Sequence, residues 1–134
     1  GAKAVAIAHQ KGIQVVPLTG PSSIYLALMA SGLNGQNFMF HGYLPIEKNL
    51  RSKTIKDLEK LSSQYHATQI FIETPYRNNA MLNDLVHILK PQTLLCIGSN
   101  IQTEKENIKT MSVSAWKNQL PDLHKIPAIF LFQS

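Results

Sequence analysis

Three short polar stretches of this sequence contain residues that could bind a small ligand. They are residues 19–23 (TGPSS), 73–77 (ETPYR) and 98–100 (GSN), and each follows an apolar run typical of a β-strand. Ligands of open α/β sheets gather where strands end and loops lead into helices. Small residues there admit a ligand to the backbone, and N–H groups at a helix start can hold a polar group. Composition alone favours an ordinary turn and helix cap for the first stretch, and none of the three is a phosphate-loop or dinucleotide fingerprint.

Metal, covalent and redox chemistry have little support in the sequence. The five histidines never fall at a spacing that suits a metal, so we expect no metal site. No order of serine, histidine and aspartate marks a nucleophile. The single cysteine, Cys96, lies in an apolar run and is expected to be a small core residue. Glu73 ends another apolar run, where it could accept a hydrogen bond from a ligand, pair with Arg77 or turn into solvent.

The positive charge of the chain is concentrated on one predicted helix. Thirteen lysines and arginines against eight acids give a net charge of +5, which favours an anionic partner such as RNA. Lys53, Lys56 and Lys60 share one helix face and could follow a phosphate backbone, and Arg77 is a further candidate RNA contact. Asp57 and Glu59 interrupt this charge, so the same face could equally be the solvated side of an amphipathic helix.

Length and composition indicate a single globular domain. The chain has 134 residues, of which 44% are hydrophobic and 16% charged. No apolar run reaches the roughly 18 to 20 residues of a transmembrane helix, and no signal peptide opens the sequence. We therefore expect a soluble, cytoplasmic protein without a membrane partner. The sequence opens with Gly1 rather than methionine, so either its start has been replaced or it is a piece of a longer protein.

Alternating predicted elements position the three polar stretches. Helices are expected over 2–11, 24–31, 48–65, 78–90 and 114–120, and strands over 13–18, 38–43, 68–73, 93–97, 107–113 and 128–132. This alternation predicts an α/β layered domain with a mixed, largely parallel five- or six-stranded sheet flanked by helices.

Four segments in order resemble the carboxyl-terminal half of the tetrapyrrole methylase superfamily. They are residues 15–23 (VVPLTGPSS), 30–33 (ASGL), 40–45 (FHGYLP) and 71–77 (FIETPYR). The pattern is most similar to a branch of ribosomal RNA methyltransferases, which carry P-G-P-S, F-x-G-F-L-P and E-S-P-H-R segments. The resemblance covers nearly the whole chain.

The resemblance implies a transferase that uses S-adenosylmethionine. The family has two α/β domains with the cofactor in the cleft between them, and it works as a homodimer. Residues 1–134 would form only the second domain, so we expect the isolated chain to have little or no activity. Carried over by position, the cofactor-binding residues are Pro21, Ser22, Ser23, Glu73, Thr74, Asn100 and Ala128.

One departure from the family pattern leaves the methyl acceptor open. After the strand predicted over 93–97, the RNA enzymes tend to read arginine, glutamate, leucine, threonine, lysine, where this chain reads GSNIQ. We expect a ribosomal RNA ribose hydroxyl as acceptor. The alternatives are tetrapyrrole methylation, or a non-enzymatic domain for RNA binding or association. No residue is assigned as a catalytic acid or base.

Overall fold

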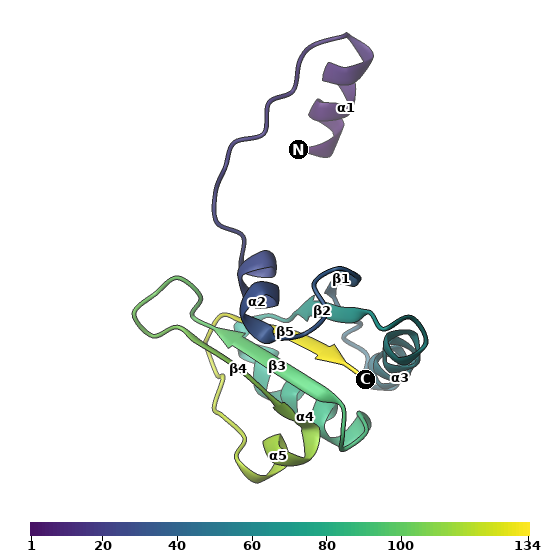
Figure 1. Cartoon of the computed structure of the whole chain (residues 1–134), viewed down its shortest axis with the longest axis vertical. Coiled ribbons are helices and arrows are strands. Elements are labelled where there is room, and N and C mark those ends of the chain that lie inside the picture. The colour runs from purple at the N-terminus through teal and green to yellow at the C-terminus, as the bar shows by residue number, and fades with distance from the viewer.

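A five-stranded sheet organises the chain, whose computed structural model describes all residues 1–134 (Figure 1). The helices are α1 (Ala2–Gln10), α2 (Ser23–Ser31), α3 (Lys48–Tyr65), α4 (Asn78–Ile88) and α5 (Val113–Asn118), with a short 3-10 turn η1 (Pro75–Arg77) before α4. The strands are β1 (Phe38–Tyr43), β2 (Thr68–Ile72), β3 (Leu94–Ser99), β4 (Asn107–Ser112) and β5 (Ala128–Gln133). Ten of the eleven predicted elements are present, with bounds within about two residues of the predicted ones.

The sheet is mixed, as predicted, but it is not largely parallel. Its order is β1-β2-β5-β3-β4, and only β1 and β2 pair in parallel. The other three pairs are antiparallel. A short loop joins β3 to β4, and parallel neighbours would need a crossover of a dozen or more residues. β5 inserts between β2 and β3 and runs opposite to both, which accounts for the remaining antiparallel pairs.

Helices cover both faces of the sheet, and alternate residues of each inner strand point to opposite faces. In β5, Phe130 and Phe132 belong to the larger core cluster, which also contains side chains of α3, α4 and α5. Ile129 and Leu131 belong to a smaller cluster beneath α2. Cys96 is fully buried in that smaller cluster, as expected for a core residue, and burial raises the pKa of its thiol.

The amino-terminal segment projects from this body (Figure 1). No residue of α1 is buried, and the segment that follows it is exposed. The strand predicted over 13–18 is wrong: these residues form no strand, and Leu18 is 92% exposed. Their β-branched side chains favour extended backbone, but a strand also needs a neighbour for its hydrogen bonds, and none lies beside this segment.

The longest helix, α3, has the bounds that the sequence predicts. Glu47 caps its first turn, because the carboxylate accepts hydrogen bonds from the backbone N–H groups of Asn49 and Leu50 at 3.0 and 2.7 Å. These bonds lower the pKa of Glu47. His66 ends the helix in the left-handed conformation, with φ of 51°. No helix of the structure is both long enough and apolar enough to cross a lipid bilayer.

Candidate functional site

The topology brings the predicted cofactor residues to one end of the sheet. β2 and β3 both end there, and β5, antiparallel to both, begins there. Ser99 pairs with Ala128, and the backbone N–H of Asn100 donates to the carbonyl of Pro127 at 3.0 Å. We call this end of the sheet the carboxyl rim. β1, parallel to β2, also ends at it.

A small cavity of about 150 Å³ lies where α2 meets the carboxyl rim. Ser23 and Ala128 both line it, together with Ile72, Ile101, Pro127 and Ile129. Ile72 adjoins Glu73 in the sequence, and Ile101 adjoins Asn100. The predicted cofactor residues near positions 23, 73, 100 and 128 therefore converge here. Ser22 is the N-cap of α2 but makes no side-chain capping bond, and Pro21 is exposed just before it.

A second cavity, of about 480 Å³, lies between the ends of β1 and β2. Its lining is Tyr43, Leu44, Pro45, Ile46, Thr74 and Arg77. Gly42 immediately precedes this lining and has φ of 67°, a conformation that glycine adopts without the Cβ penalty of other residues. The register of β1 on β2 shifts between Phe40 and Tyr43, where Gly42 lies. The irregular end of β1 thus leads directly into the apolar wall of this cavity.

Glu73 directly follows β2 and is buried. Its side chain anchors the turn after that strand. Its Oε1 accepts hydrogen bonds from the backbone N–H of Thr74 at 2.7 Å and from Nε of Arg77 at 3.1 Å. The side chain of Glu73 is 1% exposed, so it does not turn into solvent. Its second oxygen, Oε2, is buried without any hydrogen-bond donor. Buried acceptors are rarely left unpaired, so Oε2 needs a donor that the described chain does not supply, although Glu73 itself lines neither cavity.

The loop after β3 has a tight internal geometry. Asn100 and Gln102 adopt positive φ values of 49° and 65°. The carbonyl of Asn100 accepts hydrogen bonds from both the N–H and the hydroxyl of Thr103. Glu106 accepts a bond from the N–H of Gln102 at 2.8 Å. The side chain of Asn100 has no hydrogen-bond partner of its own and remains available at the rim.

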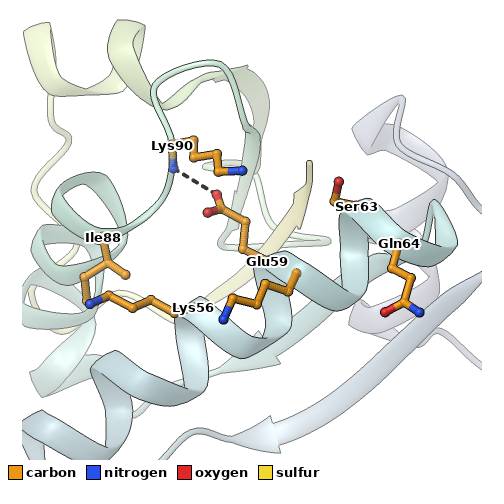
Figure 2. Close-up of a pocket in the computed structure, with 7 residues that line it drawn as sticks. Lys56, Glu59, Ser63, Gln64, Ile88 and Lys90 are labelled. Atoms are coloured by element: carbon orange, nitrogen blue, oxygen red, sulfur yellow. Dashed lines mark hydrogen bonds between the residues drawn. The ribbon is translucent and has the colours of Figure 1, made fainter.

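The candidate RNA contacts lie in two places. Lys53, Lys56 and Lys60 are exposed on α3, and only Lys56 and Lys60 line a hollow, which they share with Lys90 (Figure 2). Arg77 lies at the carboxyl rim, where it is paired with Glu73. The structure therefore does not bring Arg77 together with the three lysines.

Sequence reasoning did not assign two sets of site residues. Residues 43–45 of the apolar wall were part of the family pattern, and the glycine before them was the available signal. Lys90 was not found because it is distant in sequence from the lysines that it joins. No group of three or more histidine, cysteine, aspartate or glutamate side chains is placed to hold a metal ion.

In sequence, the chain is similar to proteins of one name from several organisms. No model of a known protein family matches the chain. The chain is 34% identical over 115 residues to ribosomal RNA small subunit methyltransferase I of Mesorhizobium japonicum, and 32% identical over 106 residues to that of Vibrio cholerae. These matches cover 86% and 79% of this chain but only 38% and 35% of the relatives. The chain thus matches little more than a third of the length of these curated relatives.

Solved structures with the same fold are also methyltransferases. The structure of the methyltransferase CobJ is similar with a TM-score of 0.60 and 14% identity, covering 99% of this chain and 56% of that one. Cobalt precorrin-4 methyltransferase CbiF, a cobalamin biosynthetic enzyme, is similar with a TM-score of 0.59 and 12% identity, covering 98% and 57%. At this identity the likeness establishes the fold. By sequence this chain is homologous to part of the ribosomal RNA small subunit methyltransferase I proteins, and its fold is that of the methyltransferases CobJ and CbiF.

Proposed function

We propose that the chain forms the cofactor-binding half of an S-adenosylmethionine-dependent methyltransferase. The observation that carries this proposal is the convergence of the predicted cofactor segments at the carboxyl rim, in a chain homologous to named methyltransferases. When bound, the cofactor supplies an activated methyl group. The chain's own contribution is to hold the cofactor in position, which accelerates transfer by proximity and orientation.

The residues at the rim fit parts of such a cofactor. Oε2 of Glu73 lacks a donor, and the ribose hydroxyls or the amino group of the cofactor are donors of the kind it needs. The wall that Tyr43, Leu44 and Pro45 form suits a flat apolar ring such as adenine. Ser23 and Asn100 add polar side chains. The site needs no metal and no covalent intermediate, and no residue is assigned as a general base.

We propose that a preceding α/β domain completes the cofactor site. The exposed apolar side chains of α1 and of residues 13–18 support this, because single-domain proteins rarely leave a whole apolar segment in water. A neighbouring domain would supply the partner strand that Val15 and Val16 lack. We expect the 134-residue chain alone to have little or no methyltransferase activity.

The names of the relatives favour ribosomal RNA as acceptor, with a ribose hydroxyl as the methylated group, over tetrapyrrole methylation. That acceptor would place the protein in the cytoplasm. Residues 98–102 (GSNIQ), which end β3 and begin the loop after it, carry no charged side chain, so RNA contacts must come from elsewhere.

We also propose a homodimer. The supporting observation is β1, one of the two outer strands of the sheet, which has a free edge and exposes Met39, Phe40 and Tyr43. Tyr25 and Met29 of α2 are exposed as well, and the ring of Tyr25 packs edge-on against Phe38 of β1. An apolar strand edge of this kind is normally covered by another chain or element.

Thermal unfolding of the full-length protein with S-adenosylmethionine tests the cofactor proposal. At a hundred times its dissociation constant, a ligand stabilises the folded state by about 2.7 kcal/mol, or roughly 5 to 10 °C in Tm. Ser23→Tyr should abolish the rise by filling the small cavity, whereas Ser114→Tyr, on the exposed surface of α5, should retain it. No rise at saturating cofactor would refute the proposal.

A further inference from the structure

A basic hollow of about 470 Å³ lies between α3 and the residues that follow α4 (Figure 2). It is far from the carboxyl rim. Its polar lining comes from Lys56, Glu59, Lys60, Ser63 and Gln64 of α3 and from Lys90. The first five lie within two and a half turns of one helix, at spacings that place them on neighbouring positions of its surface.

The lysines of the hollow have no acidic partners. The two ion pairs of the chain are Arg51–Asp84 and Arg77–Glu73, and neither involves a lysine. Glu59 is the one acid in the lining, and its Oε2 is already engaged by the backbone N–H of Lys90 at 2.9 Å and the hydroxyl of Thr93 at 2.7 Å. Three positive charges against one negative charge leave the hollow with a net positive charge.

Glu59 also fixes the shape of the hollow. It is buried, and its bonds to Lys90 and Thr93 tie the segment between α4 and β3 to the side of α3. Figure 2 shows the bond to the Lys90 backbone. The lysine ammonium groups are therefore presented from two segments whose relative position is held by a buried carboxylate. The hydroxyl of Ser63 and the amide of Gln64 add neutral donors beside them.

We propose that this hollow binds the phosphate groups of an RNA backbone. Lysine ammonium groups and neutral donors suit phosphate oxygens, which accept several hydrogen bonds and carry charge. The lining has no aromatic ring on which a base could stack, so the contact is to the backbone and is independent of sequence. The choice of RNA, rather than another phosphate, rests on the proposed function.

The position of the hollow defines its role as an anchor. Thr93 directly precedes β3, and Asn100 directly follows it, so the hollow and the cofactor segments lie at opposite ends of the sheet. Six strand residues span about 20 Å. An RNA held here is bound at a distance from the reacting group, so the hollow contributes to affinity and takes no part in the chemical step.

The test is the affinity of the 134-residue chain for a fluorescein-labelled single-stranded RNA of 16 nucleotides, measured by anisotropy between 50 and 200 mM salt. The variant Lys56→Gln/Lys60→Gln/Lys90→Gln removes the charges of the hollow. Its matched control, Lys3→Gln/Lys11→Gln/Lys117→Gln, removes three exposed and unpaired lysines elsewhere. We expect at least a tenfold loss of affinity in the first variant, with a salt slope smaller by about 2, and less than a twofold loss in the control.

Three results would overturn the proposal. One is equal loss in both variants, which would mean that only net charge matters. Another is no loss in the first variant. The third is displacement of the RNA by micromolar pyrophosphate, which would identify a free polyphosphate as the ligand. The thermal shift with S-adenosylmethionine does not depend on these lysines, so failure here leaves the cofactor proposal standing, and the reverse also holds.

Discussion

Arg51 of α3 and Asp84 of α4 form an ion pair that is almost completely buried. Nη2 and Nε of Arg51 lie 2.5 and 2.7 Å from Oδ2 of Asp84, and the two side chains are 10% and 12% exposed. Nη1 of Arg51 also donates to the carbonyl of Ile46 at 3.0 Å, just before α3 begins. One guanidinium thus joins α3, α4 and the segment that lines the larger cavity at the carboxyl rim.

Removing one partner of this pair should destabilise the chain severely. Asp84→Ala leaves the Arg51 guanidinium buried without its counter-charge, and losses of this kind are about 3 to 5 kcal/mol. The double variant Arg51→Met/Asp84→Leu buries no charge and should recover most of that loss. Urea unfolding of the three proteins measures both effects. A double variant as unstable as Asp84→Ala would contradict this expectation. It would show that the ion pair contributes more to stability than the neutralisation of two buried charges.

Glu59 should be important for stability, whereas its neighbour Asp57 should not. Glu59→Ala deprives the Lys90 N–H and the Thr93 hydroxyl of a charged acceptor, so the free energy of unfolding should fall by about 2 kcal/mol. Asp57 is exposed and makes no side-chain hydrogen bond or ion pair, so Asp57→Ala is the matched control and should change it by less than about 0.5 kcal/mol. Similar effects of the two substitutions in urea unfolding would contradict the role assigned to Glu59.

The cap at Glu47 should make stability depend on pH in the acid range. The backbone N–H groups of Asn49 and Leu50 lower the pKa of Glu47 from 4.5 in the folded state. The stabilisation is therefore fully present above pH 4.5 and is lost as the pH falls through the lowered folded pKa. Glu47→Ala should lower Tm at pH 7 and have little effect once the carboxylate is protonated. Glu104→Ala, in an exposed loop, is the control, and an identical Tm profile for both variants would rule out the cap.

Gly98 should resist substitution although its backbone conformation suits any residue. A Cβ there would lie 3.1 Å from Cδ1 of Ile101 and 3.1 Å from Cγ2 of Ile129. Both isoleucines line the small cavity, so Gly98→Ala should destabilise the chain by about 1 kcal/mol and reduce the room beside Ser23. At Gly35 a Cβ would meet nothing within 4 Å, so Gly35→Ala is the control. Calorimetry and cofactor titration of both variants check the prediction; equal stability would contradict it.

Local signals account for what the sequence predicted correctly. The bounds of α3 follow from its apolar periodicity and from Glu47, and both are encoded within one segment. The strand directions could not be predicted from local patterns, because they depend on where β5 inserts into the sheet. The extended run at 13–18 has the composition of a strand, but its state depends on a neighbour outside the segment.

The candidate site was likewise predictable from the sequence only in part. The resemblance predicted which segments bind the cofactor, and the fold brings these predicted segments to one rim. The buried, unpartnered oxygen of Glu73 could not be predicted, because it depends on how Arg77 and Thr74 share the other oxygen. The basic hollow depends on the docking of Lys90 beside α3, a contact between residues about thirty positions apart.

The central position of β5 has a consequence for synthesis on the ribosome. β5 is the last strand in the sequence, yet it separates β2 from β3 and packs Phe130 against Phe71 with the rings 5.8 Å apart. Until residue 133 has emerged from the exit tunnel, β2 and β3 each have an unsatisfied inner edge and the core lacks two of its aromatic rings. The nascent chain must therefore remain partly open until β5 has been made, and in that interval it is a client for chaperones that shield unpaired strands.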